Sequence, residues 1–290
     1  MKNKSPLRYP GGKTRACKTL DAILTSHFDM RNIDTVISPF FGGGSFEFHL
    51  QNKYNVSIVA NDKFKPLYSF WDRSKYENPE LCSKLYAALR DPGGRGAPEH
   101  MADATTSKIR FEELKKGIMD EKRGLNQAVS YFIINRCSFS GATLSGGFSK
   151  EAAKNRFTKS SVDRIQSLSL SNFTISNEDF SEFINRVCSG KPTKSSPKTN
   201  LILFLDPPYY LKKKSTLYGR NGDMHESFDH VKLFKCLSAP EENFVPWFMT
   251  YNNCDYIRNL YKKYTIIDTG WSYGMNKSKE SSEIVIINSV

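Results

Sequence analysis

The stretch LILFLDPPY, residues 201–209, decides the fold class. Its five apolar residues are typical of a strand buried on both faces of a parallel sheet. Asp206-Pro207-Pro208-Tyr209 then forms a stiff turn, because two prolines fix φ and remove two backbone donors. Ligands bind such sheets at the carboxyl ends of the strands. An acceptor, a free carbonyl and a flat ring suit a planar base with an exocyclic amine, but a strand-ending turn with a solvated aspartate also explains these residues.

Similar apolar runs recur along the chain and alternate with helical patterns. The expected strands span residues 35–38, 56–60, 201–205, 247–251, 264–267 and 283–288. The expected helices span residues 13–28, 79–89, 125–134, 180–187 and 230–237. This alternation predicts a mostly parallel α/β sheet. Residues 73–164 show helical and polar patterns but no convincing strand, so we expect a helical insertion within a sheet domain that comprises residues 1–72 and 165–290.

The excess of basic residues indicates what kind of molecule the protein binds. The chain has 290 residues, and its 42 Lys and Arg against 30 Asp and Glu give a net charge of +12. This excess favours polyanionic partners, nucleic acid before an acidic membrane surface. The apolar stretches are too short to span a membrane, and we expect no secretory signal. Six scattered cysteines predict reduced thiols in a cytoplasmic protein, and the five histidines have no ligand spacing, so we expect no metal.

A glycine-rich segment follows the first expected strand. Pro39-Phe40-Phe41-Gly42-Gly43-Gly44 opens a helix, and its glycines allow a ligand to approach the backbone N–H groups. Glu47 departs from the dinucleotide fingerprint, which argues against a pyrophosphate cofactor. Asp62 ends the next strand, where an acid commonly accepts ribose hydroxyls. Glycines and one acid do not by themselves identify a cofactor.

Arg8-Tyr9-Pro10-Gly11-Gly12-Lys13 stands near the N-terminus and alone reads as a basic turn. Together with the glycine-rich segment, Asp62 and the D-P-P-Y turn, it resembles the D12 class of DNA adenine-N6 methyltransferases, which includes the bacterial Dam enzymes. Other segments share this resemblance: Asn135-Arg136-Cys137-Ser138-Phe139-Ser140-Gly141, Gly146-Gly147-Phe148, Arg156-Phe157, Tyr218-Gly219, His225, Phe228-Asp229-His230, Leu233 and residues 247–252.

The resemblance implies a Rossmann-like, S-adenosylmethionine-dependent methyltransferase sheet with a target-recognition insertion at residues 73–164, in the family's α arrangement. It implies methyl transfer from S-adenosylmethionine to N6 of an adenine flipped out of duplex DNA. Asp206 and the Pro207 carbonyl would accept the N6 hydrogens, and Tyr209 would stack on the base. The implied cofactor-binding residues are Tyr9, Lys13, Pro39, Phe40, Phe41, Gly42, Gly44, Asp62, Asp179, Phe180 and Asp206.

Basic residues are the expected contacts to DNA phosphates. The candidates are Arg136, Lys150, Arg156, Lys212, Lys213 and Lys214, with Lys154 and Lys159 in the same insertion. A solvated charge run explains the three consecutive lysines equally well, and Arg136 suits either a guanine edge or a structural role. We expect a monomer in the cytoplasm of a bacterium or of a phage-infected cell, with any restriction endonuclease acting separately.

Three other functions stay open. N4-cytosine methylation also targets an exocyclic amine, although Asp rather than Ser before Pro-Pro-Tyr favours adenine. A catalytically silent nucleic-acid-binding protein is possible on this fold, but Asp62, Asp206 and Tyr209 are all present, which argues against it. An RNA substrate is compatible with the net charge, although the order of the motifs favours DNA.

Overall fold

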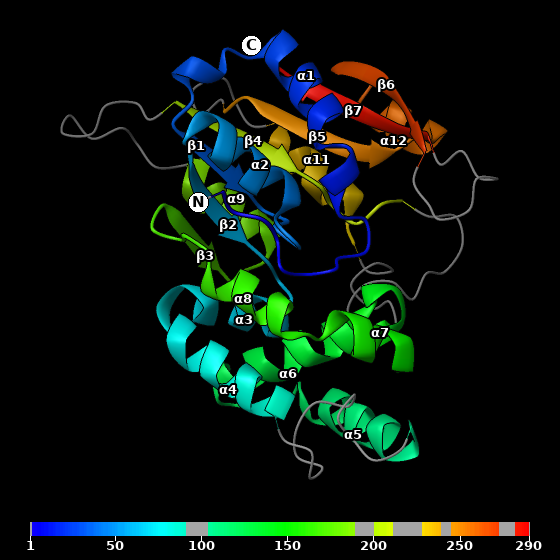
Figure 1. The fold of residues 1–290 in the computed structure, drawn as a ribbon. Helices are drawn as coiled ribbons and strands as arrows, with labels where there is room; N and C mark the ends of the chain where they lie inside the picture. Colours follow the sequence, from blue (N-terminus) through cyan, green and yellow to red (C-terminus); the bar gives the residue numbers. More distant parts are fainter. Residues whose placement is uncertain are drawn as a thin grey trace. The chain divides into compact units, whose positions relative to one another are not determined.

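The computed structural model describes residues 2–90, 104–188, 200–210, 228–238, 245–272 and 282–289. In these residues seven strands form one sheet in the order β3-β2-β1-β4-β5-β7-β6 (Figure 1). Strands β1 to β5 pair in parallel, whereas β7 runs antiparallel to both β5 and β6. The strands are β1 Thr35–Ser38, β2 Ser57–Asn61, β3 Phe173–Ser176, β4 Leu201–Leu205, β5 Trp247–Asn252, β6 Thr265–Ser272 and β7 Ser282–Asn288. The predicted Rossmann-like, mostly parallel sheet is confirmed.

The described chain divides into two compact units. Residues 2–12, 64–90 and 104–171 form the first, which we call the helical unit, and the remaining described residues form the second, the sheet unit. The division falls between Gly12 and Lys13, inside the R-Y-P-G-G-K segment. Each unit therefore has its own core and is described separately.

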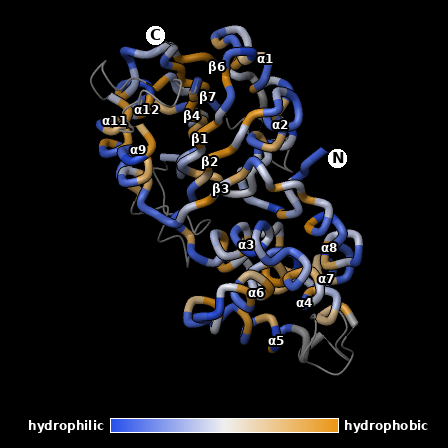
Figure 2. The backbone as a smooth tube through the Cα atoms, turned by 90° about the vertical axis from the view of Figure 1, so that its left-hand side faces the viewer, coloured by the Kyte–Doolittle hydropathy of each residue, from blue (hydrophilic) through white to orange (hydrophobic). Residues whose placement is uncertain are grey.

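Both faces of the sheet in the sheet unit are buried, as the apolar runs predict. Figure 2 shows hydrophobic residues along its central strands, between α1 and α2 on one side and α9 and α11 on the other. Ile37 and Leu203 belong to one core with α9 and α11, whereas their neighbours Val36 and Ile202 belong to the other core with α1 and α2. This follows from the alternation of side chains along a strand. The helices of this unit are η1 Lys13–Arg15, α1 Cys17–His27, η2 Met30–Asn32, α2 Ser45–Tyr54, α9 Phe180–Cys188, α11 His230–Leu237 and α12 Asp255–Leu260.

The helical unit is built around α6, which is buried on almost every side. Phe132 of α6 stacks on Phe70 of α3 with ring centroids 5.6 Å apart. Within the described part of residues 73–164, β pairing is limited to an isolated bridge between Ser138 and Phe148. The helices of this unit are α3 Lys65–Tyr76, α4 Asn78–Arg90, α5 Ala104–Gly117, α6 Gly124–Cys137, η4 Phe139–Gly141, η5 Thr143–Ser145, α7 Lys150–Arg156 and α8 Lys159–Gln166.

The sequence patterns do not individually predict helices α3, α5, α7, α8 and α12, and two further features differ from the expected elements. Strand β3 was absent from the predicted strands because only Phe173 of its four residues is buried, so it lacks a continuous apolar run. The helix expected over residues 13–28 is a short 3-10 turn followed by α1. No helix in the described ranges is both long and apolar enough to cross a membrane.

Candidate active site

The D-P-P-Y turn leaves the carboxyl end of β4, beside β1, where the strand order of the sheet reverses direction. The Nζ atom of Lys13 lies 2.7 Å from each carboxylate oxygen of Asp206. The Thr250 hydroxyl donates to Oδ1 of the same carboxylate at 2.6 Å. Lys13 is 3% exposed and Thr250 is fully buried, whereas the Asp206 side chain is 23% exposed. The carboxylate is therefore held from the protein side and remains partly accessible.

Tyr209 is fixed at its hydroxyl end. Its hydroxyl donates to Oε1 of Glu283 at 2.9 Å, and its ring lies 5.8 Å from the Tyr251 ring at an interplanar angle of 26°. Burial raises the pKa of Tyr209 well above its ordinary value, and the charges of Asp206 and Glu283 raise it further. The phenol consequently stays neutral and acts as a donor. The next residue is also held, because the Asn252 side chain donates to the Tyr210 carbonyl at 2.7 Å.

The glycine-rich segment forms a tight loop between β1 and α2. Gly42 and Gly44 both have positive φ, of 51° and 64°, and a Cβ atom at position 44 would collide with the Phe41 ring. The Gly42 amide donates to Oδ2 of Asp62 at 3.0 Å. Asp62, which is 8% exposed, therefore links the ends of β1 and β2. The structure brings these predicted residues together at one edge of the sheet.

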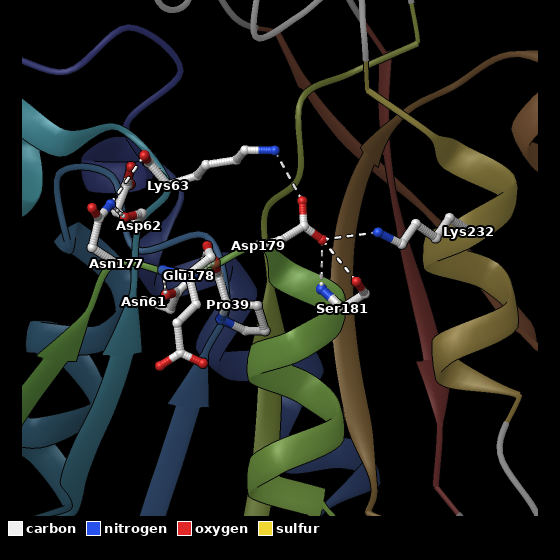
Figure 3. A network of polar contacts seen from close by, with 9 residues as sticks. All are labelled: Pro39, Asn61, Asp62, Lys63, Asn177, Glu178, Asp179, Ser181 and Lys232. Carbon is white, nitrogen blue, oxygen red and sulfur yellow. Dashed lines mark hydrogen bonds and ion pairs between the residues drawn. The ribbon is translucent and has the colours of Figure 1, made fainter.

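Two asparagines, neither of them a predicted site residue, join the loops that follow β1, β2 and β3 (Figure 3). The side-chain amide of Asn61 donates to the carbonyls of Pro39 and Glu178, at 3.2 Å each, and its oxygen accepts from the Glu178 amide at 2.9 Å. The Asn177 side chain donates to the Asp62 carbonyl at 2.8 Å. These bonds set the relative positions of the three loops.

Asp179 caps the start of α9 and binds two lysines from other elements (Figure 3). Lys63 contacts Oδ2 at 2.9 Å, and Lys232 of α11 contacts Oδ1 at 3.1 Å. The Ser181 hydroxyl donates to Oδ1 at 2.7 Å. Burial opposes ionisation, but the hydrogen bonds from Lys63, Ser181 and Lys232 hold the pKa of Asp179 well below its usual range. Asp179 is therefore a permanently charged acceptor at neutral pH.

Three phenylalanine rings gather next to this carboxylate. The ring centroids of Phe40, Phe180 and Phe228 are 5.2–5.6 Å apart. Phe180 is 7% exposed, and the other two are half-buried. Lys232 lies above the Phe180 ring, with Nζ 5.4 Å from its centroid. The cluster offers apolar ring faces beside a charged acceptor.

Glu47 in the first turn of α2 is a buried acid that the motifs did not single out as functional. It is 2% exposed and accepts a hydrogen bond from the Ser38 hydroxyl at 2.6 Å. Burial raises its pKa to about 8, and the nearby charge of Asp206 contributes. Glu47 therefore carries a proton at neutral pH. The only signal in the sequence is a lone acid between Phe46 and Phe48, on a helix start rich in apolar residues.

The predicted DNA contacts differ in their surroundings within the helical unit. Arg136 is 7% exposed and donates to the carbonyls of Arg156 at 2.7 Å and Pro6 at 3.2 Å, which favours its structural alternative. Burial lowers its pKa to about 10, and the charges of Arg164, Arg8 and Arg156 contribute. Lys150 is exposed, and Arg156 is half-buried.

Tyr9 and the remaining predicted lysines lie in different parts of the chain. Tyr9 belongs to the helical unit, where its carbonyl accepts from the Gly12 amide at 3.0 Å. Lys154 is exposed, and Lys159 binds Asp163 at 3.2 Å. Lys212, Lys213 and Lys214 lie outside the described residues. In the part of the chain that the structure describes, no cluster of three or more His, Cys, Asp or Glu side chains could hold a metal ion.

The architecture is that of a Rossmann-like methyltransferase, and a comparison with protein-family models gives the particular family. Residues 9–275 match the model of the D12 class N6 adenine-specific DNA methyltransferases. Because the match covers most of the chain, the protein belongs to this family, whose activity is methylation of adenine in DNA. No protein in the curated collections that were compared matches the chain.

Proposed function

We propose that this protein transfers a methyl group from S-adenosylmethionine to N6 of an adenine that is flipped out of duplex DNA at a specific site. The observation that supports this most strongly is the Asp206 carboxylate, held by Lys13 and Thr250 at the end of β4 beside the Tyr209 ring. Membership of the adenine-specific family gives the second support and favours adenine over cytosine.

The side chains at the ends of β1, β2 and β3 fit S-adenosylmethionine by their chemistry. The buried Asp62 carboxylate suits ribose hydroxyls, and the ionised Asp179 suits an exocyclic adenine amine. The Phe40 and Phe180 rings suit an adenine face. At Gly44 a Cβ atom would collide with the Phe41 ring, so the tight loop after β1 requires glycine there. When bound, S-adenosylmethionine supplies an electrophilic methyl group on a sulfonium.

The chain's own residues then act on the adenine. N6 is a poor nucleophile because its lone pair is delocalised into the ring. In our proposal the Asp206 carboxylate and the Pro207 carbonyl accept hydrogen bonds from the two N6 hydrogens and return electron density to the nitrogen. As the N6–carbon bond forms, the carbon–sulfur bond of the sulfonium would break to leave a thioether, and N6 would release one proton. Tyr209 stacks on the base and holds N6 in line with the methyl group, so orientation and electrostatics supply most of the acceleration. Contacts in the pocket offset the few kcal/mol that flipping costs.

DNA contacts are assigned by this proposal to the helical unit. Arg8, Arg156 and Arg164 all affect the pKa of Arg136, so their positive charges lie close together. Within the described residues none of these four arginines forms an ion pair with an acid. Arg136 is bound to backbone carbonyls, so the guanidinium groups of Arg8, Arg156 and Arg164 are the ones that suit DNA phosphates. Base readout is assigned to side chains of residues 73–164.

The test is the identity of the methylated nucleoside. Duplex DNA that lacks methylation is incubated with the protein and S-adenosylmethionine carrying a deuterated methyl group, and the digested nucleosides are separated by mass spectrometry. We expect the label in the deoxynucleoside N6-methyldeoxyadenosine. Label in N4-methylcytosine, or in RNA but not in DNA, would disprove the proposed substrate. Absence of label from every substrate, with the cofactor bound, would favour a silent binding protein.

A further inference from the structure

Side chains on one face of β5 hold both ends of the segment from Asp206 to Tyr210. Thr250 and Asn252 are two residues apart on β5 and therefore face the same side of the strand. Thr250 binds the Asp206 carboxylate at 2.6 Å, and Asn252 binds the Tyr210 carbonyl at 2.7 Å. The sheet thus fixes the beginning and the end of the catalytic turn.

Glu283 of β7 extends the same face. It pairs directly with Asn252 across the antiparallel β5–β7 ladder, and directly opposite residues share a face. Its carboxylate accepts the Tyr209 hydroxyl at 2.9 Å. Glu283 is 4% exposed, whereas Tyr209 is half-buried. The hydroxyl end of Tyr209 therefore points into the protein, and part of the side chain remains accessible.

We propose that Glu283 is a positioning residue for the methyl transfer, because it anchors the Tyr209 ring in its stacking position before the target base arrives. This inference rests on the proposed function. Glu283 lies beyond residues 9–275, the part of the chain that matches the family model, so the family match does not assign it a role.

The Nζ atom of Lys13 lies 5.1 Å from the centroid of the Tyr209 ring, and two further contacts restrict this ring. The bond to Glu283 fixes the hydroxyl, and Tyr251 lies nearly parallel to the ring, with centroids 5.8 Å apart. A ring held in this way loses little freedom when a base stacks on it, and a misplacement of about 1 Å can cost roughly a hundredfold in rate. A phenylalanine at this position would stack but could not be anchored. The anchor therefore gives the hydroxyl of the D-P-P-Y tyrosine a function separate from stacking.

The experiment measures single-turnover methylation of duplex DNA and, separately, the Kd of S-adenosylmethionine. We expect Tyr209→Phe and Glu283→Leu each to lower the transfer rate about tenfold, as for loss of a hydrogen bond to a charged group, and the cofactor Kd to change less than twofold. The double variant should be no slower than either single variant, because both remove the same bond. Glu283→Gln keeps an acceptor and should recover most of the rate lost in Glu283→Leu.

Tyr261→Phe is the matched control. Tyr261 is a fully buried tyrosine of the sheet unit, and its hydroxyl has no hydrogen-bond partner among the described residues. Removal of the Tyr261 hydroxyl should leave the rate of methyl transfer unchanged. A wild-type rate in Tyr209→Phe, or effects of the two substitutions that multiply in the double variant, would overturn the proposal. If Glu283→Leu does not fold, the methyl-transfer rate of Tyr209→Phe decides whether the proposal holds.

If the wild-type protein methylates no nucleic acid, the proposed function fails, and the anchor is tested by stability instead. A double-mutant cycle on the free energy of unfolding then uses Tyr209→Phe and Glu283→Leu, which each remove the bond. Coupling between the two positions supports the anchor as a structural contact without the reaction, whereas additive effects contradict the anchor itself.

Discussion

Ionisable side chains are concentrated around the D-P-P-Y turn, and each has a defined partner. Lys13 binds Asp206, Glu283 binds Tyr209, and Glu47 binds Ser38. Buried charges are tolerated in proteins when they are paired. Here the buried Lys13 acts on two carboxyl groups, Asp206 and Glu47, and the less exposed of the two, Glu47, keeps its proton. The pKa of about 8 at Glu47 is thus a consequence of its burial near the charge of Asp206.

Glu47 predicts a specific pH dependence of stability. Its folded pKa is raised from 4.5 to about 8, so its contribution to stability is complete below pH 4.5 and is lost as pH rises toward 8. The loss approaches ~1.4 kcal/mol per pH unit within this window. Glu47→Gln removes the titration and should flatten the dependence. Urea unfolding at pH 5, 6.5 and 8 measures it, and an equal pH dependence in both proteins would show that Glu47 does not titrate there.

At the scale of elements, the site depends on how the strand ends are joined. The loops after β1, β2 and β3 carry Phe40, Asp62 and Asp179, and the Asn61 side chain binds backbone groups of the loops that follow β1 and β3. Asn61 is 1% exposed, so its four polar contacts are shielded from water. One buried amide therefore determines the spacing of groups assigned to the cofactor.

Asn61→Ala should lower the free energy of unfolding by ~2–4 kcal/mol, because it leaves several buried backbone groups unsatisfied. We also expect a higher Kd for the cofactor, because the loops lose the hydrogen bonds from the Asn61 side chain that hold them together. Asn177→Ala is the control, because it removes two bonds at a half-buried position in the same loops and should cost less. Urea unfolding and calorimetric titration measure both effects. Equal losses in the two variants would contradict a central role for Asn61.

The sequence predicts the elements and the motif residues well because their signals are local. Apolar runs mark β1, β2, β4 and β5, and the carboxyl ends of parallel strands meet at one edge, so Asp62 and Asp206 were expected at the same site. Strand β3 lacks such a run. Glu283, Thr250 and Asn61 were missed because their roles depend on strand register across long separations, 74 residues in the case of Glu283 and Tyr209.

At the scale of the whole molecule, the net charge of +12 predicts binding to DNA that weakens as salt rises. The arginines near Arg136 lack acidic partners within the described residues, whereas Arg31 is paired with Asp29 at 2.8 Å. Arg156 and Arg31 therefore carry the same charge in different surroundings. Of these two residues, we expect only Arg156 to contact DNA phosphates and release counterions.

Arg156→Gln should reduce the slope of log K against log[salt] by about one, because one phosphate contact is lost. Arg31→Gln removes the same charge from a paired, exposed arginine and should leave the slope unchanged. Fluorescence anisotropy with a labelled duplex between 50 and 200 mM salt measures the slope. Equal slopes in the two variants would place the DNA contacts elsewhere.

The central claim is that the Asp206 carboxylate accepts a hydrogen bond from the N6 amino group of the target adenine. Its most direct test is the single-turnover rate of methyl transfer to duplex DNA in wild type and in Asp206→Asn, which keeps the shape of the side chain but removes its charge. We predict that wild type forms N6-methyladenine and that the substitution slows transfer by roughly 10²–10³-fold, as for loss of a preorganised electrostatic contact. Transfer by Asp206→Asn at the wild-type rate would contradict this account.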